Sequence, residues 1–327
     1  MTSVDTVAEQ APSVQDGPLL AAEAVSRVFE TAAGPVVALA EATLEVHRGE
    51  LVVIKGRSGS GKTTLLNVLS GLDRPTSGRV VVDGVEVGTA DETALVALRR
   101  RSVGFVFQSF GLIPVLSAAE NVEVPLRLLG TPHAERDARV AELLERVGLA
   151  AHARQRPTEL SGGQQQRVGV ARGLAVDPNI LLMDEPFGAV DPIVRDDLQN
   201  ELLRLQRDLG KTVLFVTHDI DEAFRLGDQV VIFRKGGIVA QKGTPAEILA
   251  SPADDFVASF VGADRGKRAL HIEQTPTGSV LVDSEGRTAG VLSSEPSPDR
   301  DSKAAAVSVA GGADAVTQGG APPRLTQ

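Results

Sequence analysis

A glycine-rich stretch over residues 56–64, GRSGSGKTT, is the part of this sequence that most directly predicts chemistry. It fits the pattern G-x-x-x-x-G-K-[ST], follows an apolar run at 51–54 that is typical of a buried strand, and leads into a helical pattern at 65–69. In that order of strand, loop and helix, backbone N–H groups converge on phosphate oxygens, and the helix N-terminus adds partial positive charge. Lys62 is expected to reach the β- and γ-phosphates, and the Thr63 hydroxyl to bind Mg²⁺. The alternative, a glycine-rich turn with a surface lysine, does not account for the flanking strand and helix. The predicted nucleotide-binding residues of this loop are Gly56, Arg57, Ser58, Gly59, Ser60, Gly61, Lys62, Thr63 and Thr64.

A second anion site is predicted about a hundred residues further on, at Leu160–Gln164. Ser161 is placed as a helix N-cap, and the apolar pattern from Val168 to Leu174 continues the helix. Gly162 and Gly163 leave N–H groups at the helix start open to an anion. Alone this pattern is weak evidence, but together with the phosphate loop it strongly indicates a second phosphate site in the chain.

Polar residues follow three apolar strands that we expect in one parallel sheet. Asp184 and Glu185 follow the run 180–183, Gln108 follows 103–107, and His218 comes two residues after 212–216. Carboxyl ends of parallel strands meet at one edge, so Asp184 is expected to hold Mg²⁺ and Glu185 to orient or deprotonate a water. His218 is expected at the γ-phosphate. The alternatives are that the two carboxylates merely end a strand and that His218 is a structural or surface histidine.

Phe29 is a candidate for the base-binding residue. The chain has ten Phe and neither Tyr nor Trp, and a flat ring ahead of a phosphate loop can stack on adenine. The alternative is that Phe29 is a core residue of its strand.

The remaining pattern predicts an α/β domain with additions. Residues 19–29 and 36–46 alternate as two antiparallel strands around a turn at Gly34-Pro35, and Arg99–Arg101 is expected at a solvated helix end. Residues 117–153 are rich in Ala, Leu, Glu and Arg, which indicates a helical insertion. The predicted organisation is a disordered leader at 1–18, an ATPase domain at 19–262 with its helical insertion at about 110–175, a short appendage at 263–294 and a disordered tail at 295–327.

Composition excludes several functional classes. The hydrophobic fraction of 42% and the charged fraction of 23% are ordinary for a globular protein, and the formal net charge of −10 disfavours nucleic-acid binding. The absence of cysteine rules out disulfides, thiol catalysis and Cys-based zinc sites. The sequence has no apolar run of the roughly 18 residues that span a bilayer, and its start does not resemble a signal peptide. A cytoplasmic protein is expected, reaching a membrane only through a partner.

The ordered set of motifs resembles the ATP-binding subunit of an ABC transporter, over roughly residues 20 to 262. The resemblance implies a P-loop NTPase fold, the ABC ATPase domain, with an antiparallel β subdomain and a helical insertion. It implies that Phe29 stacks on adenine, that 56–63 is the Walker A motif, and that Gln108 is the Q-loop ligand of Mg²⁺. It also implies that Asp184 is the Walker B aspartate and Glu185 the catalytic base. In the same way it makes Ser161, Gly162, Gly163 and Gln164 signature residues, Asp191 part of the D-loop and His218 the switch histidine. Position 29 is Phe rather than the usual Tyr, and position 190 is Val rather than the usual Leu.

The resemblance further implies an ATPase with ATP and Mg²⁺ as ligands, in which two copies pair head to tail. The signature of one copy then closes over the ATP held by the other, and Lys62, Mg²⁺ and His218 stabilise the charge as water attacks the γ-phosphorus. The implied partners are a second copy of the chain, integral-membrane permease subunits contacted through the helical insertion, and an extracytoplasmic substrate-binding protein. The implied location is the inner face of the cell membrane.

Two regions of the sequence point to different cargoes. Residues 160–268 resemble the ATPases of importers for glycine betaine, choline or proline, whereas 71–130 resemble lipoprotein-release and macrolide- or peptide-export ATPases. We expect uptake of a quaternary amine or osmoprotectant, with export as the alternative. Residues 279–292 are similar to the end of a nucleotide-sensing CBS module but are too short for a pair. A soluble, non-transport ABC ATPase is disfavoured because the chain has one ATPase domain and no long coiled coil.

Overall fold

The computed structural model of the chain describes residues 17–188, 190–262, 271–275, 278–282 and 288–291. Two compact units are present, Met1–Ala253 and Asp254–Gln327, and each is described by itself. The predicted tail at 295–327 and all but the last two residues of the predicted leader lie outside the described residues. The predicted domain boundaries therefore stay predictions.

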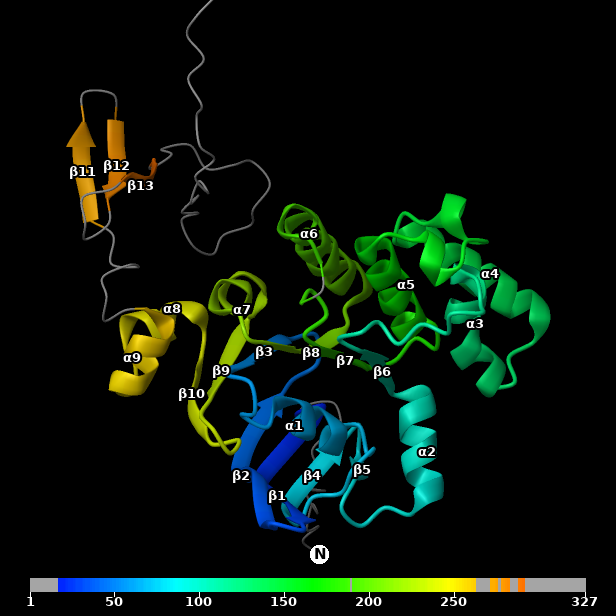
Figure 1. Cartoon of the computed structure of the whole chain (residues 1–327), viewed down its shortest axis with the longest axis horizontal. Coiled ribbons are helices and arrows are strands. Elements are labelled where there is room, and N and C mark those ends of the chain that lie inside the picture. Colours follow the sequence, from blue (N-terminus) through cyan, green and yellow to red (C-terminus); the bar gives the residue numbers. More distant parts are fainter. Residues whose placement is uncertain (1–16, 189, 263–270, 276–277, 283–287, 292–327) are drawn as a thin grey trace, which may run out of the picture. The chain divides into compact units, whose positions relative to one another are not determined.

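A six-stranded sheet forms the centre of the first unit, with strand order β10-β9-β3-β8-β7-β6. All its neighbouring strands pair in parallel except β10, which runs antiparallel to β9. Most residues of these strands are apolar and buried, as expected for a parallel sheet covered on both faces. Helices α5, α6 and α7 cover one face, and α1 lies against the other (Figure 1). The strands are β3 (Leu51–Gly56), β6 (Val103–Val106), β7 (Ile180–Asp184), β8 (Thr212–Thr217), β9 (Gln229–Phe233) and β10 (Val239–Gly243).

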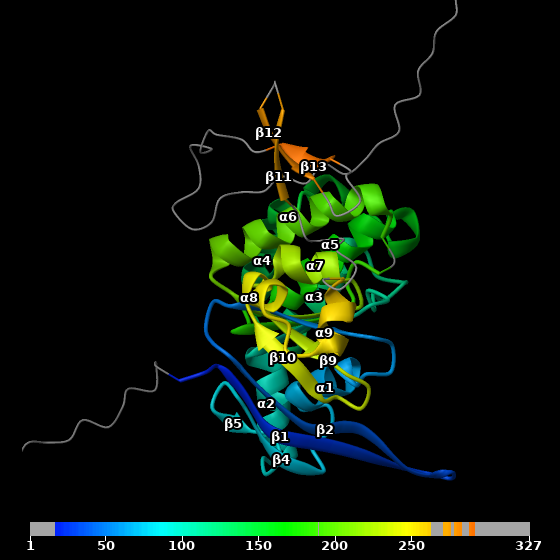
Figure 2. The same cartoon turned by 90° about the vertical axis from the view of Figure 1, so that its left-hand side faces the viewer.

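A four-stranded antiparallel sheet, in the order β2-β1-β4-β5, packs on the far side of α1. One continuous core joins the two sheets, and it includes Leu65, Leu66 and Leu69 of α1. Strands β1 and β2 run past the end of β4 as a long hairpin (Figure 2). The elements are β1 (Leu20–Thr31), β2 (Gly34–Val46), β4 (Ser77–Val82), β5 (Val85–Glu86) and α1 (Lys62–Leu69).

The hairpin turn lies two residues earlier than predicted. Gly34 and Pro35 are the first residues of β2, and they pair with Thr31 and Glu30 across the hairpin. The turn is therefore made by residues 32–33. Because β2 is an edge strand, a proline without an N–H is tolerated there, so Gly-Pro does not have to mark the turn.

Four helices lie between β5 and β7, and three of them, α3, α4 and α5, fall in the region where a helical insertion was predicted. Helix α2 ends in the basic run Arg99–Arg101, as expected for a helix C-terminus. Ser117 begins α3 and Ser161 begins α5, each through a reciprocal capping box. The helices are α2 (Glu92–Arg101), α3 (Ala118–Leu128), α4 (His133–Arg146) and α5 (Gly162–Leu174), with short 3-10 turns at Ala150–His152 and Pro157–Glu159.

An ion-pair cluster centred on Glu123 joins α3 to α4. Glu123 is buried, and its carboxylate contacts Arg127 at 2.6 Å on the same helix and Arg136 at 2.7 Å on α4. The hydrogen bond from Arg127, opposed by burial and reinforced by Arg136, lowers the pKa of Glu123 below its ordinary value.

The Glu123 cluster predicts a pH-dependent contribution to stability. Because the folded pKa lies below the unfolded one, the unfolded chain binds more protons, so this contribution is lost as pH falls through the folded pKa. Arg136→Met should therefore cost on the order of 1–2 kcal/mol of unfolding free energy near pH 7, and the cost should shrink below the ordinary glutamate pKa of about 4.3. Urea unfolding of both proteins from pH 7 to about pH 3 measures the difference, because the window lies below the ordinary glutamate pKa. A cost that does not change with pH would contradict the assignment.

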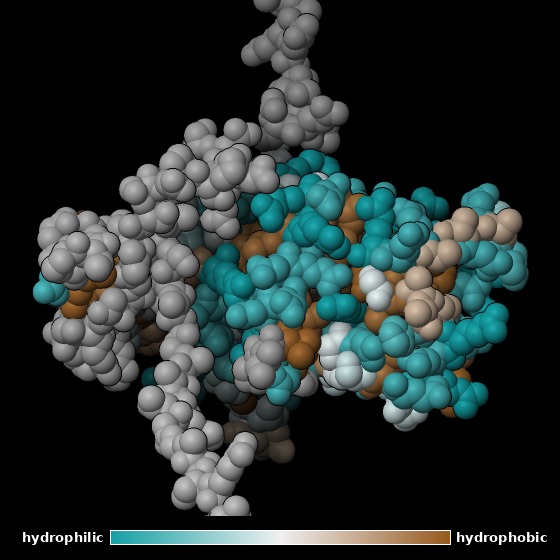
Figure 3. Space-filling model, turned by 90° about the horizontal axis from the view of Figure 1, so that it is seen from above, coloured by the Kyte–Doolittle hydropathy of each residue, from teal (hydrophilic) through white to brown (hydrophobic). Residues whose placement is uncertain are grey.

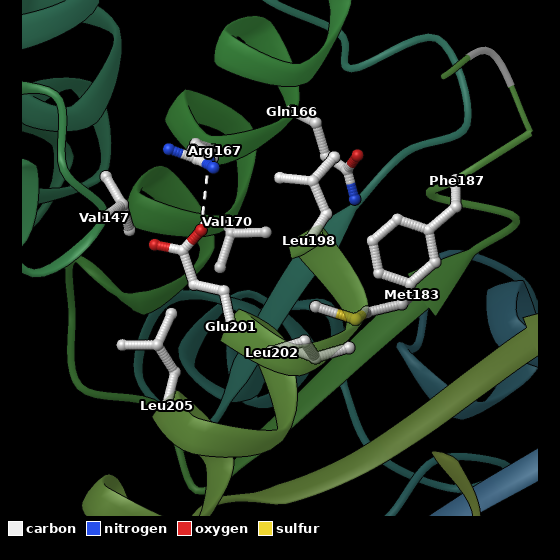
Figure 4. A pocket seen from close by; sticks show the side chains of 10 residues that line it. All are labelled: Val147, Gln166, Arg167, Val170, Met183, Phe187, Leu198, Glu201, Leu202 and Leu205. Carbon is white, nitrogen blue, oxygen red and sulfur yellow. Dashed lines mark ion pairs between the residues drawn. The ribbon is translucent and has the colours of Figure 1, made fainter. Parts of the chain in front are cut away.

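Helices α5 and α6 (Pro192–Leu209) pack around a small cavity of about 20 Å³. Three leucines of the predicted apolar face of α6, Leu198, Leu202 and Leu205, line it together with Met183 and Phe187. At its edge Arg167 Nε lies 3.0 Å from Glu201 Oε2 (Figure 4). The N–H does not point along that line, so the contact is an ion pair without a hydrogen bond. Burial raises the pKa of Glu201, opposed by the charge of Arg167.

The first unit ends with α7 (Ile220–Leu226) and α8 (Pro245–Ala250), and the second unit contains α9 (Asp255–Val261) and a three-stranded antiparallel sheet. The sheet has the order β11-β12-β13, with β11 at His271–Thr275, β12 at Gly278–Val282 and β13 at Thr288–Val291. Seen from above, the surface not covered by grey atoms is mostly hydrophilic, with small separated apolar patches (Figure 3). Within the described ranges, none of the helices combines the length and the apolar character needed to cross a bilayer.

Candidate nucleotide site

The predicted phosphate loop joins the end of β3 to the start of α1. Gly59 and Gly61 have φ values of +74° and +92°, which side chains with a Cβ rarely adopt. A Cβ on Gly61 would lie 2.3 Å from the carbonyl oxygen of Ala38, so this position has no space for a side chain. The loop therefore wraps tightly around the N-terminus of an eight-residue helix, as a phosphate site requires.

Lys62 is buried at the centre of this loop. Its Nζ donates to the carbonyl oxygens of Gly56 at 3.0 Å and Arg57 at 3.3 Å, and lies 3.4 Å from Glu185 Oε1. The ammonium group is thus held against the loop by backbone acceptors and one carboxylate. The Lys62 ammonium group is therefore placed to contact phosphate oxygens bound in the loop.

Thr63 and Asp184 form the candidate Mg²⁺ site. The Thr63 hydroxyl donates to Asp184 Oδ2 at 2.9 Å, which joins the first turn of α1 to the end of β7. Burial raises the pKa of Asp184, while the hydrogen bond from Thr63 opposes the shift. A buried carboxylate beside a hydroxyl fits Mg²⁺, which favours oxygen ligands and takes one or two carboxylates plus substrate phosphates. Among the described residues, no group of three or more His, Cys, Asp or Glu side chains is placed to hold a metal ion.

Glu185 connects the predicted catalytic residues. Its Oε2 lies 3.1 Å from His218 Nδ1 and accepts from Gln108 Nε2 at 3.3 Å, while its Oε1 faces Lys62. Its backbone has φ +42°, and its N–H donates to the Val216 carbonyl at 2.9 Å. A left-handed conformation is costly for a residue with a side chain and is concentrated at functional sites. The sheet edge thus brings Glu185, Gln108 and His218 together, as their positions after three strands predicted.

These residues line one open cleft of about 320 Å³. Its lining residues are Ser58, Gly59, Ser60, Gly61, Lys62, Thr63, Thr64, Gln108, Glu185 and His218. Gly56 and Arg57 do not line the cleft, and their carbonyl oxygens accept hydrogen bonds from Lys62 Nζ. Ser60 is buried, and no protein partner for its hydroxyl is found in the described part of the chain. A polar cleft with glycine N–H groups, a lysine and a carboxylate can bind a phosphate chain and activate a water beside it.

Phe29 lies on β1, outside the lining of the cleft. Its side chain is 37% exposed, so it is not the core residue that the alternative interpretation required. The Arg27 guanidinium lies 4.4 Å from the ring centroid, on one face. Stacking of adenine on Phe29 stays a prediction.

If Phe29 stacks on adenine, its replacement should weaken binding of the base and not of the phosphates. Phe29→Leu is expected to lower ATP affinity about three- to tenfold, the size of one aromatic stacking contact. Affinity for inorganic tripolyphosphate should not change. Isothermal titration with both ligands tests this, and an equal loss for both would mean that the substitution disturbs the loop.

The predicted signature residues do not reach this cleft. Ser161 accepts from the Gln164 N–H at 3.3 Å and its own N–H donates to Gln164 Oε1 at 2.9 Å, so both residues cap α5. Gly162 is exposed, whereas Gly163 is buried against Val194 of α6. Among the described residues that line the cleft, none comes from Leu160–Gln164. Within one chain, therefore, the two predicted phosphate contacts do not form one site.

Asp191, the predicted D-loop residue, is exposed just before α6 and likewise does not line the cleft. Its backbone carbonyl accepts from the N–H groups of Val194 at 3.1 Å and Arg195 at 3.0 Å, which begins the helix. Any contact of Asp191 with nucleotide stays a prediction.

Sequence reasoning missed a buried pair behind His218. Glu222 of α7 accepts from Gln199 Nε2 of α6 at 2.9 Å, and both side chains are buried. Burial raises the pKa of Glu222, opposed by hydrogen bonds from Thr217 and Gln199. The pair attaches the helix that follows His218 to α6. A glutamate in a short helix is usually solvated, so only the tertiary contact identifies this one.

Comparison with known proteins places these motifs in one family. A profile of the ABC transporter family matches residues 39–188. The chain is 48% identical over 235 residues to a glycine betaine/carnitine transport ATP-binding protein of Listeria monocytogenes, covering 72% of this chain and 59% of that protein. It is 47% identical over 238 residues to a trimethylamine N-oxide transport system ATP-binding protein of Ruegeria pomeroyi, covering 73% of this chain and 70% of that protein.

A solved structure shows the same architecture. The dimeric structure of an ATP-binding cassette in a post-hydrolysis state, bound to ADP and Pi, matches with a TM-score of 0.63 and 38% sequence identity, covering 69% of this chain and 98% of that one. The predicted α/β fold is thereby confirmed. The chain spans about six to seven tenths of the length of the two curated relatives named above.

Proposed function

Because the chain belongs to the ABC transporter family, we propose that it is the ATP-hydrolysing subunit of a membrane transporter that takes up a quaternary amine or related osmoprotectant. The main structural support for ATP hydrolysis is the cluster of side chains around Glu185. One carboxylate lies within 3.4 Å of Lys62 Nζ, 3.1 Å of His218 Nδ1 and 3.3 Å of Gln108 Nε2, at the open end of the phosphate loop.

Each of these residues has a defined part in the proposed hydrolysis. Glu185 accepts the proton of a water aligned with the γ-phosphorus, and Lys62 neutralises charge on the γ-phosphate oxygens. His218, held by Glu185 through Nδ1, would contact the same oxygens through Nε2. Thr63, Asp184 and the amide oxygen of Gln108 would hold Mg²⁺, which supplies charge neutralisation between the β- and γ-phosphates. ATP and Mg²⁺ are therefore the proposed ligands.

The catalytic unit is proposed to be two copies paired head to tail. The N-terminus of α5 offers free N–H groups at Gly162 but lies outside the cleft of its own chain. A phosphate contact by this helix then requires ATP held by another copy. The similarity to a dimeric cassette supports the same arrangement.

We propose that the permease binds in a groove of about 310 Å³ that lies between α2, β6, α3 and α5. Its floor includes Phe105, whose ring stacks on Phe107 at 4.3 Å, one residue before Gln108. Leu128, 61% exposed, forms part of the wall. The lining also includes Arg99, Arg100 and Arg172, so an amphipathic helix of the permease that fills this groove would press on the segment that carries Gln108. The chain would thus lie on the cytoplasmic face of the membrane through its permease.

The proposed cargo follows from the relatives. The two relatives described above are named for transport of glycine betaine, carnitine and trimethylamine N-oxide, all small molecules with a fully substituted nitrogen. An osmoprotectant import protein of Salmonella typhimurium is 48% identical over 238 residues. These names favour uptake over the export alternative suggested by residues 71–130. An importer of this type would also work with an extracytoplasmic substrate-binding protein.

Uptake by a reconstituted transporter tests this proposal. The chain is assembled in proteoliposomes with the permease and binding protein encoded beside it, and entry of labelled glycine betaine, choline, carnitine and proline is followed. We expect ATP-dependent accumulation of at least one of them, and none with Glu185→Gln. Normal ATP turnover without accumulation of any would overturn the import role, and stimulation of turnover by a lipoprotein or peptide would establish the export alternative.

A further inference from the structure

Arg172 makes an unusual set of contacts near the middle of the first unit. It lies on α5, and its guanidinium donates to the carbonyl oxygens of Gly111 at 2.6 Å and Phe110 at 2.7 Å. In the part of the chain that the structure describes, no carboxylate pairs with it. Burial lowers the pKa of its guanidinium. A partly buried cation whose partners are two backbone carbonyls is positioned for those carbonyls and not for an ion pair.

The two carbonyls belong to a strained loop. Phe110 and Gly111 have φ values of +61° and +56°, so two consecutive residues are left-handed. This conformation is a clear outlier for a bulky aromatic residue. The Phe110 side chain is buried, its N–H donates to the Phe107 carbonyl, and its own carbonyl lies over Gly169 of α5. The strained segment follows Gln108 directly, so whatever holds it also fixes the start of the loop that carries Gln108.

We propose that Arg172 is a positioning residue that clamps the loop 108–111 to α5, so that the Gln108 side chain moves with the helix that begins at Gly162. Ten residues of α-helix separate Gly162 from Arg172, about 15 Å along the axis. A displacement of the α5 N-terminus by a second copy would therefore be transmitted to Gln108 through a rigid element and two short hydrogen bonds. This proposal rests on the role of Gln108 in the proposed function.

Hydrogen exchange and metal-dependent nucleotide binding test the clamp on the isolated full chain. Arg172→Met keeps an unbranched apolar side chain and removes both hydrogen bonds. Arg172→Lys keeps the positive charge but lacks the planar guanidinium that donates to two carbonyl oxygens. Arg139→Met is the control, because Arg139 also donates to two carbonyls at the C-terminal end of α5, those of Leu174 and Ala175, but pairs with Glu142 and does not contact the loop 108–111. The probe is a non-hydrolysable ATP analogue, added with Mg²⁺ or with EDTA.

We expect amide exchange at 109–112 to be about tenfold faster in Arg172→Met, the size of one lost charged hydrogen bond, intermediate in Arg172→Lys and unchanged in Arg139→Met. Affinity for the analogue should fall with Mg²⁺ and stay unchanged with EDTA, a split that a general loss of stability would not produce. Unchanged exchange at 109–112 in Arg172→Met would overturn the clamp.

Faster exchange without a loss of the Mg²⁺-dependent affinity would overturn the positioning of Gln108. Gln108→Ala separates the two possible reasons for that result. If Gln108→Ala loses the Mg²⁺-dependent part, the metal ligand assigned in the proposed function stands and the clamp alone has failed. If Gln108→Ala keeps it, that metal ligand was wrongly assigned, and the positioning proposal fails with it.

Discussion

Replacing Glu185 by Gln should lower ATP turnover by about 10²–10³-fold while ATP binding remains, because the amide can accept no proton from the attacking water. The substitution keeps the side-chain shape and removes the negative charge that lies 3.4 Å from Lys62 Nζ. With hydrolysis blocked, the ATP-bound state should accumulate as a dimer. Turnover is measured by phosphate release, and the oligomeric state by light scattering with and without ATP.

The control for this experiment is Glu222→Gln. Glu222 is also a buried carboxyl in the same unit, but it contacts Gln199 and not the cleft. It should keep turnover within a few-fold of wild type. Normal hydrolysis by Glu185→Gln together with a monomeric state at saturating ATP would show that Glu185 is not the base and that 160–164 does not contact nucleotide.

Gly162→Asp should abolish turnover without preventing the chain from folding. Gly162 is exposed at the first position of α5, where an acidic side chain favours the helix dipole. The same charge opposes a phosphate brought to this helix start, so turnover should fall by about 10²-fold or more, as when an oxyanion donor is removed. ATP binding to the single chain should not change, since residues 160–164 lie outside its own cleft.

Phosphate release and ATP binding by calorimetry measure the two parts of this prediction. Gly88→Asp is the control, because this glycine is also exposed, has room for a Cβ without a positive φ, and lies outside the cleft. Equal loss of ATP binding and of turnover in Gly162→Asp would place the helix start in the site of its own chain and contradict the paired arrangement.

The catalytic cluster was predictable because its residues follow buried parallel strands. Such strands are short apolar runs, and their carboxyl ends share one edge, so Gln108, Asp184 and His218 had to lie near the phosphate loop. The six-stranded order itself, in which β3 pairs with both β8 and β9, is not encoded locally and was not predicted. The cap at Ser161 was predicted from local sequence and is present, whereas the cap at Ser117 was not predicted.

Hydrogen bonds from side chains to distant backbone carbonyls could not be predicted from the sequence. Arg172 is one arginine in the last turn of α5, and nothing in its sequence neighbours indicates that two left-handed residues at 110–111 accept its hydrogen bonds. The left-handed conformation of Glu185 is similarly invisible, because the surrounding fold and not the residue type imposes it. The hairpin turn was predicted two residues too late because an edge strand tolerates proline, so Gly34-Pro35 could begin β2 instead of forming the turn.

Mixing two inactive variants tests most directly whether two copies share each site. Lys62→Ala disables the loop of its own chain, and Gly162→Asp disables the signature that the chain offers to its partner. In a head-to-tail pair of the two variants, one site carries both defects and the other carries none. We therefore predict that ATP turnover, absent in each variant alone, reappears when the two are mixed with the same partners that support wild-type turnover. If mixed pairs form but show no ATP turnover and bind no ATP at the expected intact site, the shared site is contradicted.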